Sequence, residues 1–156
     1  MSLKEWQKNG WVKPHDATPQ EIERLFDVIE RDLKVSGNKD MDPDWRFVAP
    51  YNAALQGAAV ALYASGFEST KGGGAHYYTI ESLKLTVGDE GTVDELQSFK
   101  AKRGGAVYES TGIASETEIS ELRNLAEKLR NRVQAWLLAE HPALAPKPSR
   151  RKGKGK

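Results

Sequence analysis

Hydrophobic residues recur at helical spacing in two long stretches of the chain, residues 18–37 and 115–141. The first opens with a helix-start signal in which Thr18 is the expected N-cap, Pro19 takes the first helical position and Glu21 lies three residues after the cap. The second carries the longest apolar stripe of the chain. Its apolar positions are Ile119, Leu122, Leu125, Ala126, Leu129, Val133, Trp136 and Leu137. Both stretches are predicted to be amphipathic helices that bury one face.

Two further start signals have the same form. Thr92 is followed by Glu95 and Ser115 by Glu118, the spacing of a capping box. We therefore expect helices to begin at both positions. Gly104 is expected to end the Thr92 helix.

An alanine-rich helix is predicted between residues 42 and 66. Asp42 and Pro43 form its start signal, and seven alanines lie between positions 49 and 64. Pro50 is expected to kink or delay this helix, because proline lacks a backbone donor. So slim a helix suits the middle of a bundle, where neighbours approach closely.

The run HYYTIESLKLTV, residues 76–87, also has β-forming residues, but it has no convincing partner strand and is predicted to be a short helix. The expected fold class is all-α, an antiparallel bundle of four to five helices. We divide the chain into an N-terminal arm (1–17), the bundle (18–141) and a disordered basic tail (142–156).

Composition narrows the function classes. The 156 residues include no cysteine, which excludes disulfides and thiolate chemistry. The first 15 residues lack the apolar run of a signal peptide, and no segment has the length of a membrane span, so we expect a cytoplasmic protein without membrane contact. Residues 1–146 carry a formal net charge of −5, whereas the last ten residues carry six basic residues and no acidic one. An acidic body argues against nucleic-acid binding over the whole surface, but local basic clusters remain.

Three histidines are present. His15 in the arm and His141 at the end of the last helix are expected to be solvated or to cap a helix. His76 follows three glycines at the start of a short helix and is a candidate site residue. No metal-ligand pattern is visible, and the glycines lack the GK[ST] ending of a phosphate-binding loop, so no cofactor is expected.

The stretch SFKAKRGGAVYES, residues 98–110, holds the remaining candidates, Lys100, Lys102, Arg103, Tyr108 and Glu109. In one interpretation it is an ordinary helix end, where the cations complement the helix dipole and Gly104 is the cap. In the other, Arg103 holds a phosphate through its planar guanidinium, Tyr108 orients or stacks on a base, and the lysines add positive charge.

Three segments, in this order and spacing, resemble the small stand-alone HEPN-domain proteins of bacteria. They are DWRFVAPYNAALQGAAVALYASGF, GGGAHYYTIESL and LQSFKAKRGGAVYE, followed by the long final helix. The resemblance covers about residues 18–141. It implies a helical bundle that forms a homodimer, and a metal-independent endoribonuclease of a toxin–antitoxin or phage-defence system.

The family's signature is an arginine followed, after four to six residues, by a histidine, and the two protomers bring their motifs together in one cleft. Only Arg103 matches it, because Tyr108 stands where histidine is expected. Cleavage of RNA is therefore left open. The resemblance implies binding of RNA or a nucleotide, with a cognate antitoxin or defence partner. The alternatives are a protein-interaction module that uses the alanine-rich helix or Tyr77 and Tyr78, and a nucleotide sensor.

Overall fold

The computed structural model describes residues 1–109 and 115–146, with the backbone alone at residues 100 and 102–109. The chain folds into an all-α structure with one small sheet. Its elements are α1 (Leu3–Lys8), β1 (Val12–Pro14), α2 (Pro19–Ser36), α3 (Pro43–Ala64), β2 (Phe67–Ser69), α4 (Ala75–Glu81), a single 3-10 turn η1 (Ser82–Lys84), α5 (Glu90–Glu109) and α6 (Glu116–Glu140). Among the described residues, no helix is both long enough and apolar enough to cross a membrane.

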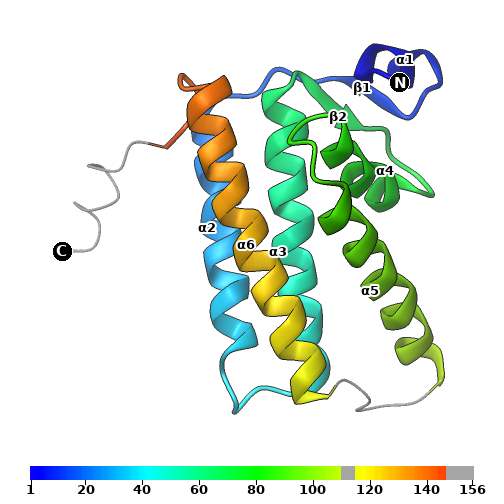
Figure 1. Cartoon of the computed structure of the whole chain (residues 1–156), viewed down its shortest axis with the longest axis vertical. Coiled ribbons are helices and arrows are strands. Elements are labelled where there is room, and N and C mark those ends of the chain that lie inside the picture. Colours follow the sequence, from blue (N-terminus) through cyan, green and yellow to red (C-terminus); the bar gives the residue numbers. More distant parts are fainter. Residues whose placement is uncertain (110–114, 147–156) are drawn as a thin grey trace.

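The long helices α2, α3 and α6 lie side by side, and α5 lies on the other side of α3 (Figure 1). Helices that follow each other in the chain, α2 with α3 and α5 with α6, run antiparallel. By contrast, α3 and α6 run in the same direction, and their first turns are joined by a bidentate ion pair between Arg46 and Glu116. The bundle is therefore not antiparallel throughout.

Helix α3 forms the centre of the bundle. Most of its residues from Arg46 to Ala64 are buried, as expected for a helix with neighbours on several sides. Ala54 and Ala58 are 1% and 0% exposed, and a Cβ at Gly57 would lie 3.6 Å from Leu129 of α6. The small side chains thus let α6 approach closely, as predicted. The helix is continuous through Pro50.

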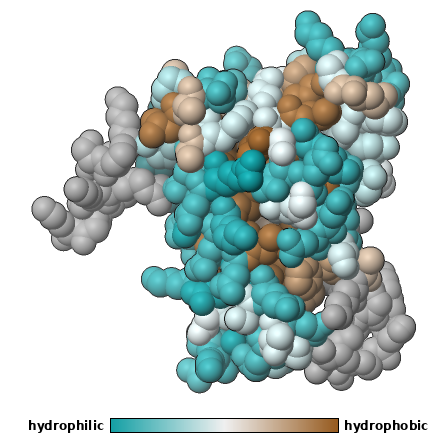
Figure 2. Space-filling model, in the orientation of Figure 1, coloured by the Kyte–Doolittle hydropathy of each residue, from teal (hydrophilic) through white to brown (hydrophobic). Residues whose placement is uncertain are grey.

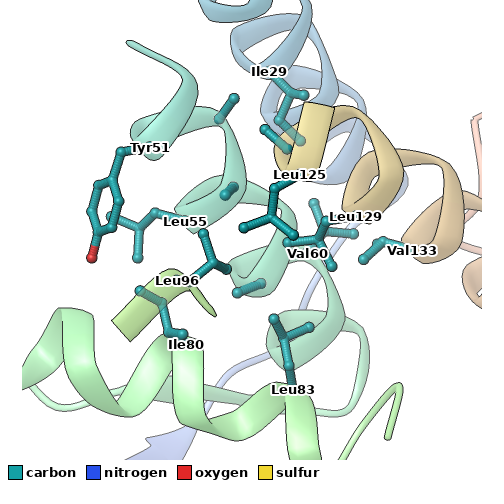
Figure 3. Close-up of a cluster of buried hydrophobic side chains, with 14 of the residues drawn as sticks. Ile29, Tyr51, Leu55, Val60, Ile80, Leu83, Leu96, Leu125, Leu129 and Val133 are labelled. Carbon is teal, nitrogen blue, oxygen red and sulfur yellow. The ribbon is translucent and has the colours of Figure 1, made fainter. Parts of the chain in front are cut away.

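The core is built from both sides of α3 (Figure 3). Leu125, Leu129 and Val133 of α6 meet the buried side chains of α3 on one side. Ile80 of α4, Leu83 of η1 and Leu96 of α5 pack on the other side. Burying each such side chain contributes about 1.5–3 kcal/mol.

Most predicted helix starts are confirmed. The Thr18 hydroxyl accepts a hydrogen bond from the Glu21 amide, the Asp42 carboxylate caps α3, and Ser115 and Glu118 form the reciprocal capping box. The predicted start at Thr92 was wrong. Helix α5 begins at Glu90, and the amide and hydroxyl of Thr92 both donate to Asp89, at 3.2 and 2.6 Å. Aspartate competes successfully for the capping position.

The N-terminal arm has structure of its own, which was not predicted. Ser2 and Glu5 form a capping box that starts α1. Strand β1 then pairs antiparallel with β2, so that Val12 lies opposite Ser69. Trp6, Val12 and Leu62 of α3 form a second, smaller core cluster, which fastens the arm to the bundle.

The predicted short helix after the glycine loop is confirmed as α4 followed by η1. Of the predicted disordered tail, residues 147–156 lie outside the described residues, whereas Leu144 and Ala145 pack against the core.

Candidate functional site

The five candidates of the 98–110 stretch all lie on the second half of α5. This helix passes through both glycines and ends at Glu109, so the predicted helix end at Gly104 was wrong. Each glycine costs a helix only about 1 kcal/mol relative to alanine, and lysine, arginine and alanine on either side favour the helix. The side chains of Lys100, Lys102, Arg103, Tyr108 and Glu109 lie outside the described part of the structure.

The continuous helix places positions 103 and 108 on different faces. Five residues correspond to roughly 140° around the axis and about 7.5 Å along it. Position 108 falls on the same face as Gln97, whereas position 103 falls on the same face as Phe99. Arg103 and Tyr108 of one chain therefore occupy separate faces of α5.

The face of Phe99 borders a groove of about 330 Å3 between α5 and α6. The groove is lined by Glu95, Phe99, Glu121, Asn124, Leu125 and Lys128. Phe99 also packs against Phe47 of α3, with a ring centroid distance of 6.0 Å. Position 103 comes one helical turn after Phe99, on the same side of α5.

Charges along the groove are mixed. Among the described lining residues, Glu95 and Glu121 are acidic and Lys128 is basic. Hydrophobic residues surface among hydrophilic ones in the middle of this side of the molecule (Figure 2).

His76 lies in a different place. It is exposed and lines a hollow of about 240 Å3 with Gly72, Gly74, Ala75 and Tyr77. The Gln97 side chain donates to the backbone oxygen of Tyr77 at 3.3 Å, which places this end of α4 beside the Gln97 turn. Position 103 is about 9 Å further along the axis and on another face. The structure does not bring His76 to Arg103.

His15 was expected to be solvated or capping, and this was wrong. Its ring lies between two carboxylates, with Nε2 2.8 Å from Glu21 and Nδ1 2.9 Å from Glu68. His141, in contrast, is the C-cap of α6, as expected, and its ring lies 5.1 Å from that of Trp136. No group of three metal-ligating side chains suited to an ion occurs in the described ranges 1–109 and 115–146.

The surfaces suggested for a protein partner are altered by the fold. The seven alanines of α3 are all buried, so they offer no docking face. Tyr78 stacks on Trp11 at 4.9 Å and meets Trp6 edge-on, which leaves Tyr77 as the exposed member of the pair. Beyond the first residue, the most exposed large apolar side chains among those the structure describes are Trp45 at 62% and Leu138 at 63%.

Sequence reasoning missed the groove and the His15 contacts. The groove is made by residues on two helices that are far apart in sequence, and no local pattern marks it. Comparison of the chain with protein-family models, with curated proteins and with solved structures found no match.

Proposed function

We propose that this protein is a HEPN-like helical protein of a toxin–antitoxin or phage-defence system, which binds RNA or a nucleotide through the second half of α5. Arg103 holds a phosphate, Lys100 and Lys102 strengthen the local positive field, and Tyr108 stacks on or orients a base. His76 and Glu109 take a peripheral part, since His76 lies on α4 and position 109 lies six residues after Arg103 on α5.

One observation carries the proposal. Three basic residues, Lys100, Lys102 and Arg103, fall within about one turn of α5, in a body whose formal net charge is otherwise negative. The phosphate backbone is attracted by clustered cations, so an anionic ligand is drawn to this turn rather than to the rest of the surface.

A homodimer would account for the separation of Arg103 and Tyr108. Arg103 and Tyr108 of one chain lie on different faces of α5, so a small ligand does not meet both in one copy. Two copies packed through their α5 helices offer Arg103 of one and Tyr108 of the other to the same cleft.

Binding is favoured over cleavage. Tyrosine has an ordinary pKa near 10 and is a poor general base at neutral pH, and His76 is not within reach of Arg103. Loss of a general base lowers a rate by about 10²- to 10⁴-fold. We therefore expect slow metal-independent cleavage at most.

The test is the affinity for a fluorescent single-stranded RNA of mixed sequence, measured over a series of salt concentrations. Arg103→Ala is expected to weaken binding about 10-fold or more and to lower the slope of log affinity against log salt by about one. Arg24→Ala is the matched control, because Arg24 is an exposed arginine on α2. Equal affinities of the two variants would contradict the proposal.

A protein-interaction module is the second candidate, favoured by Trp45. Its side chain is 62% exposed at the start of α3, one turn after the partly exposed Met41. In this case Trp45→Ser abolishes capture of a partner while Arg103→Ala leaves it intact. The nucleotide-sensor alternative predicts saturable binding of mononucleotides at the Arg103 turn, without binding of longer RNA.

A further inference from the structure

The ring of His15 is enclosed by acidic groups from two elements. Glu21 lies in the first turn of α2, and Glu68 is the middle residue of β2. The side chains of His15, Glu21 and Glu68 are 19%, 26% and 28% exposed, so water reaches all three only in part. We call these three residues the His15 clasp.

The geometry of the clasp assigns a protonation state. A carboxylate oxygen accepts hydrogen bonds, and both ring nitrogens lie within 2.9 Å of one. Both nitrogens donate only in the imidazolium form, because neutral imidazole carries a single N–H. The clasp is complete when His15 is protonated.

Other titratable groups around the ring support this state. Burial lowers the pKa of His15, whereas the hydrogen bonds to Glu21 and Glu68 and the negative charges of both raise it. The raising effects outweigh burial, so the pKa lies above the ordinary 6.5. From α3, the ring of Tyr63 lies 4.3 Å away. Burial, then the charges of Glu68 and Glu21, raise the pKa of Tyr63 as well, so this phenol stays neutral.

We propose that the His15 clasp is a proton-operated fastening, which holds the β1–β2 sheet against the start of α2 and loosens it when the ring loses its proton. A neutral ring retains one of the two hydrogen bonds and leaves two carboxylates facing each other without a cation. Glu21 is favoured in place by the positive end of the α2 dipole. The bond to Glu68 is therefore the one that is lost, on the side of the sheet.

Strand β2 transmits the change beyond the arm. The amide of His15 donates to the Gly66 oxygen at 2.9 Å, and the Thr70 amide donates to the Trp11 oxygen at 3.1 Å. The Ser69 and Thr79 hydroxyls, 2.7 Å apart, join β2 to α4. Loosening of β2 thus frees the glycine loop that leads into α4 and His76.

The direction with pH follows from the raised pKa. A protonated His15 stabilises the folded arm fully below the ordinary pKa of about 6.5, and this contribution is lost as the pH rises through the higher folded-state pKa. The arm is expected to be closed in mildly acidic solution and looser in mildly alkaline solution.

The first measurement is an NMR titration of the three histidine rings in the full chain, with His76 and His141 as internal references. We expect the His15 ring to titrate above 6.5 and Glu68→Gln to lower that midpoint. A wild-type midpoint at or below 6.5 would overturn the proposal, and so would a midpoint that Glu68→Gln leaves unchanged.

The second measurement is hydrogen exchange at the amides of His15 and Thr70, one pH unit below and one above the His15 midpoint, corrected for the intrinsic pH dependence of exchange. We expect protection to fall about 10-fold or more in the wild type, because a charge-assisted hydrogen bond is lost. Glu68→Gln keeps the shape of the clasp and reduces this change, while His76→Gln does not affect it. Equal pH dependence in the wild type and Glu68→Gln would rule the fastening out.

Discussion

The N-terminal arm and the second half of α5 differ in how they are held. The arm is fastened by a strand pair, an aromatic cluster and the His15 clasp, none of which was predicted from the sequence. The second half of α5 carries the candidate residues Arg103 and Tyr108, and the described packing contacts of this helix, Val93, Leu96 and Phe99, lie in its first half. The difference shows that long-range contacts can gather in a segment whose sequence carries no candidate site residue.

The largest effect is expected from removing the buried side chain that holds α5 against the core. Leu96 is fully buried, and Leu96→Ala is expected to lower the free energy of unfolding by about 2–5 kcal/mol, because it leaves a cavity. Leu138→Ala is the matched control on α6, since Leu138 is 63% exposed, and it is expected to change stability by less than about 0.5 kcal/mol. Urea unfolding followed by circular dichroism measures both. A cost at Leu96 as small as that at Leu138 would show that α5 is not anchored there.

A gain-of-activity variant tests the function proposed for the second half of α5. Tyr108→His supplies the proton acceptor that the HEPN signature requires, and we expect metal-independent cleavage of labelled RNA to rise about 100-fold over the wild type. The reaction is followed with a chelator present. The double variant Arg103→Ala/Tyr108→His is expected to lose the gain, and activity that persists in it would point to a contaminating nuclease.

The glycine pair of α5 allows a smaller but direct test of the continuous helix. Gly104→Ala and Gly105→Ala are each expected to stabilise the protein by about 0.5–1 kcal/mol, because alanine favours a helix interior over glycine. Gly88→Ala serves as the contrast. Gly88 has φ +81°, a conformation that costs alanine about 1 kcal/mol or more. Destabilisation by Gly104→Ala comparable to that at Gly88 would restore the helix end that the sequence suggested.

Local signals predicted the bundle well. Thr18, Asp42 and Ser115 each bond to amides two or three residues away, so the pattern and the contact lie within the same short stretch. The prediction of where α5 begins failed because Asp89 and Thr92 are both suitable N-cap residues. Their spacing in the sequence does not tell which of them caps the helix. The Ser2 and Glu5 pair had the same readable pattern and would have revealed α1.

The groove and the His15 clasp depend on contacts between residues that are far apart in the sequence. Glu68 reaches His15 across 53 positions, and the groove beside Phe99 needs α6 as its second wall. Neither follows from periodicity. The glycines at 104 and 105 misled because glycine weakens a helix without forbidding it, and the residues on both sides decide whether it continues.

The Arg46–Glu116 pair has a consequence for the order of folding. It joins residues 70 positions apart, whereas α2 and α3 are neighbours linked by six residues, so the α2–α3 hairpin closes a much shorter loop than the docking of α6 does. We expect Ile29→Val in α2 chiefly to slow folding and Val133→Ala in α6 chiefly to speed unfolding, as measured by stopped-flow kinetics. Helix α6 would then dock last, and its undocking would set the unfolding rate of the native state.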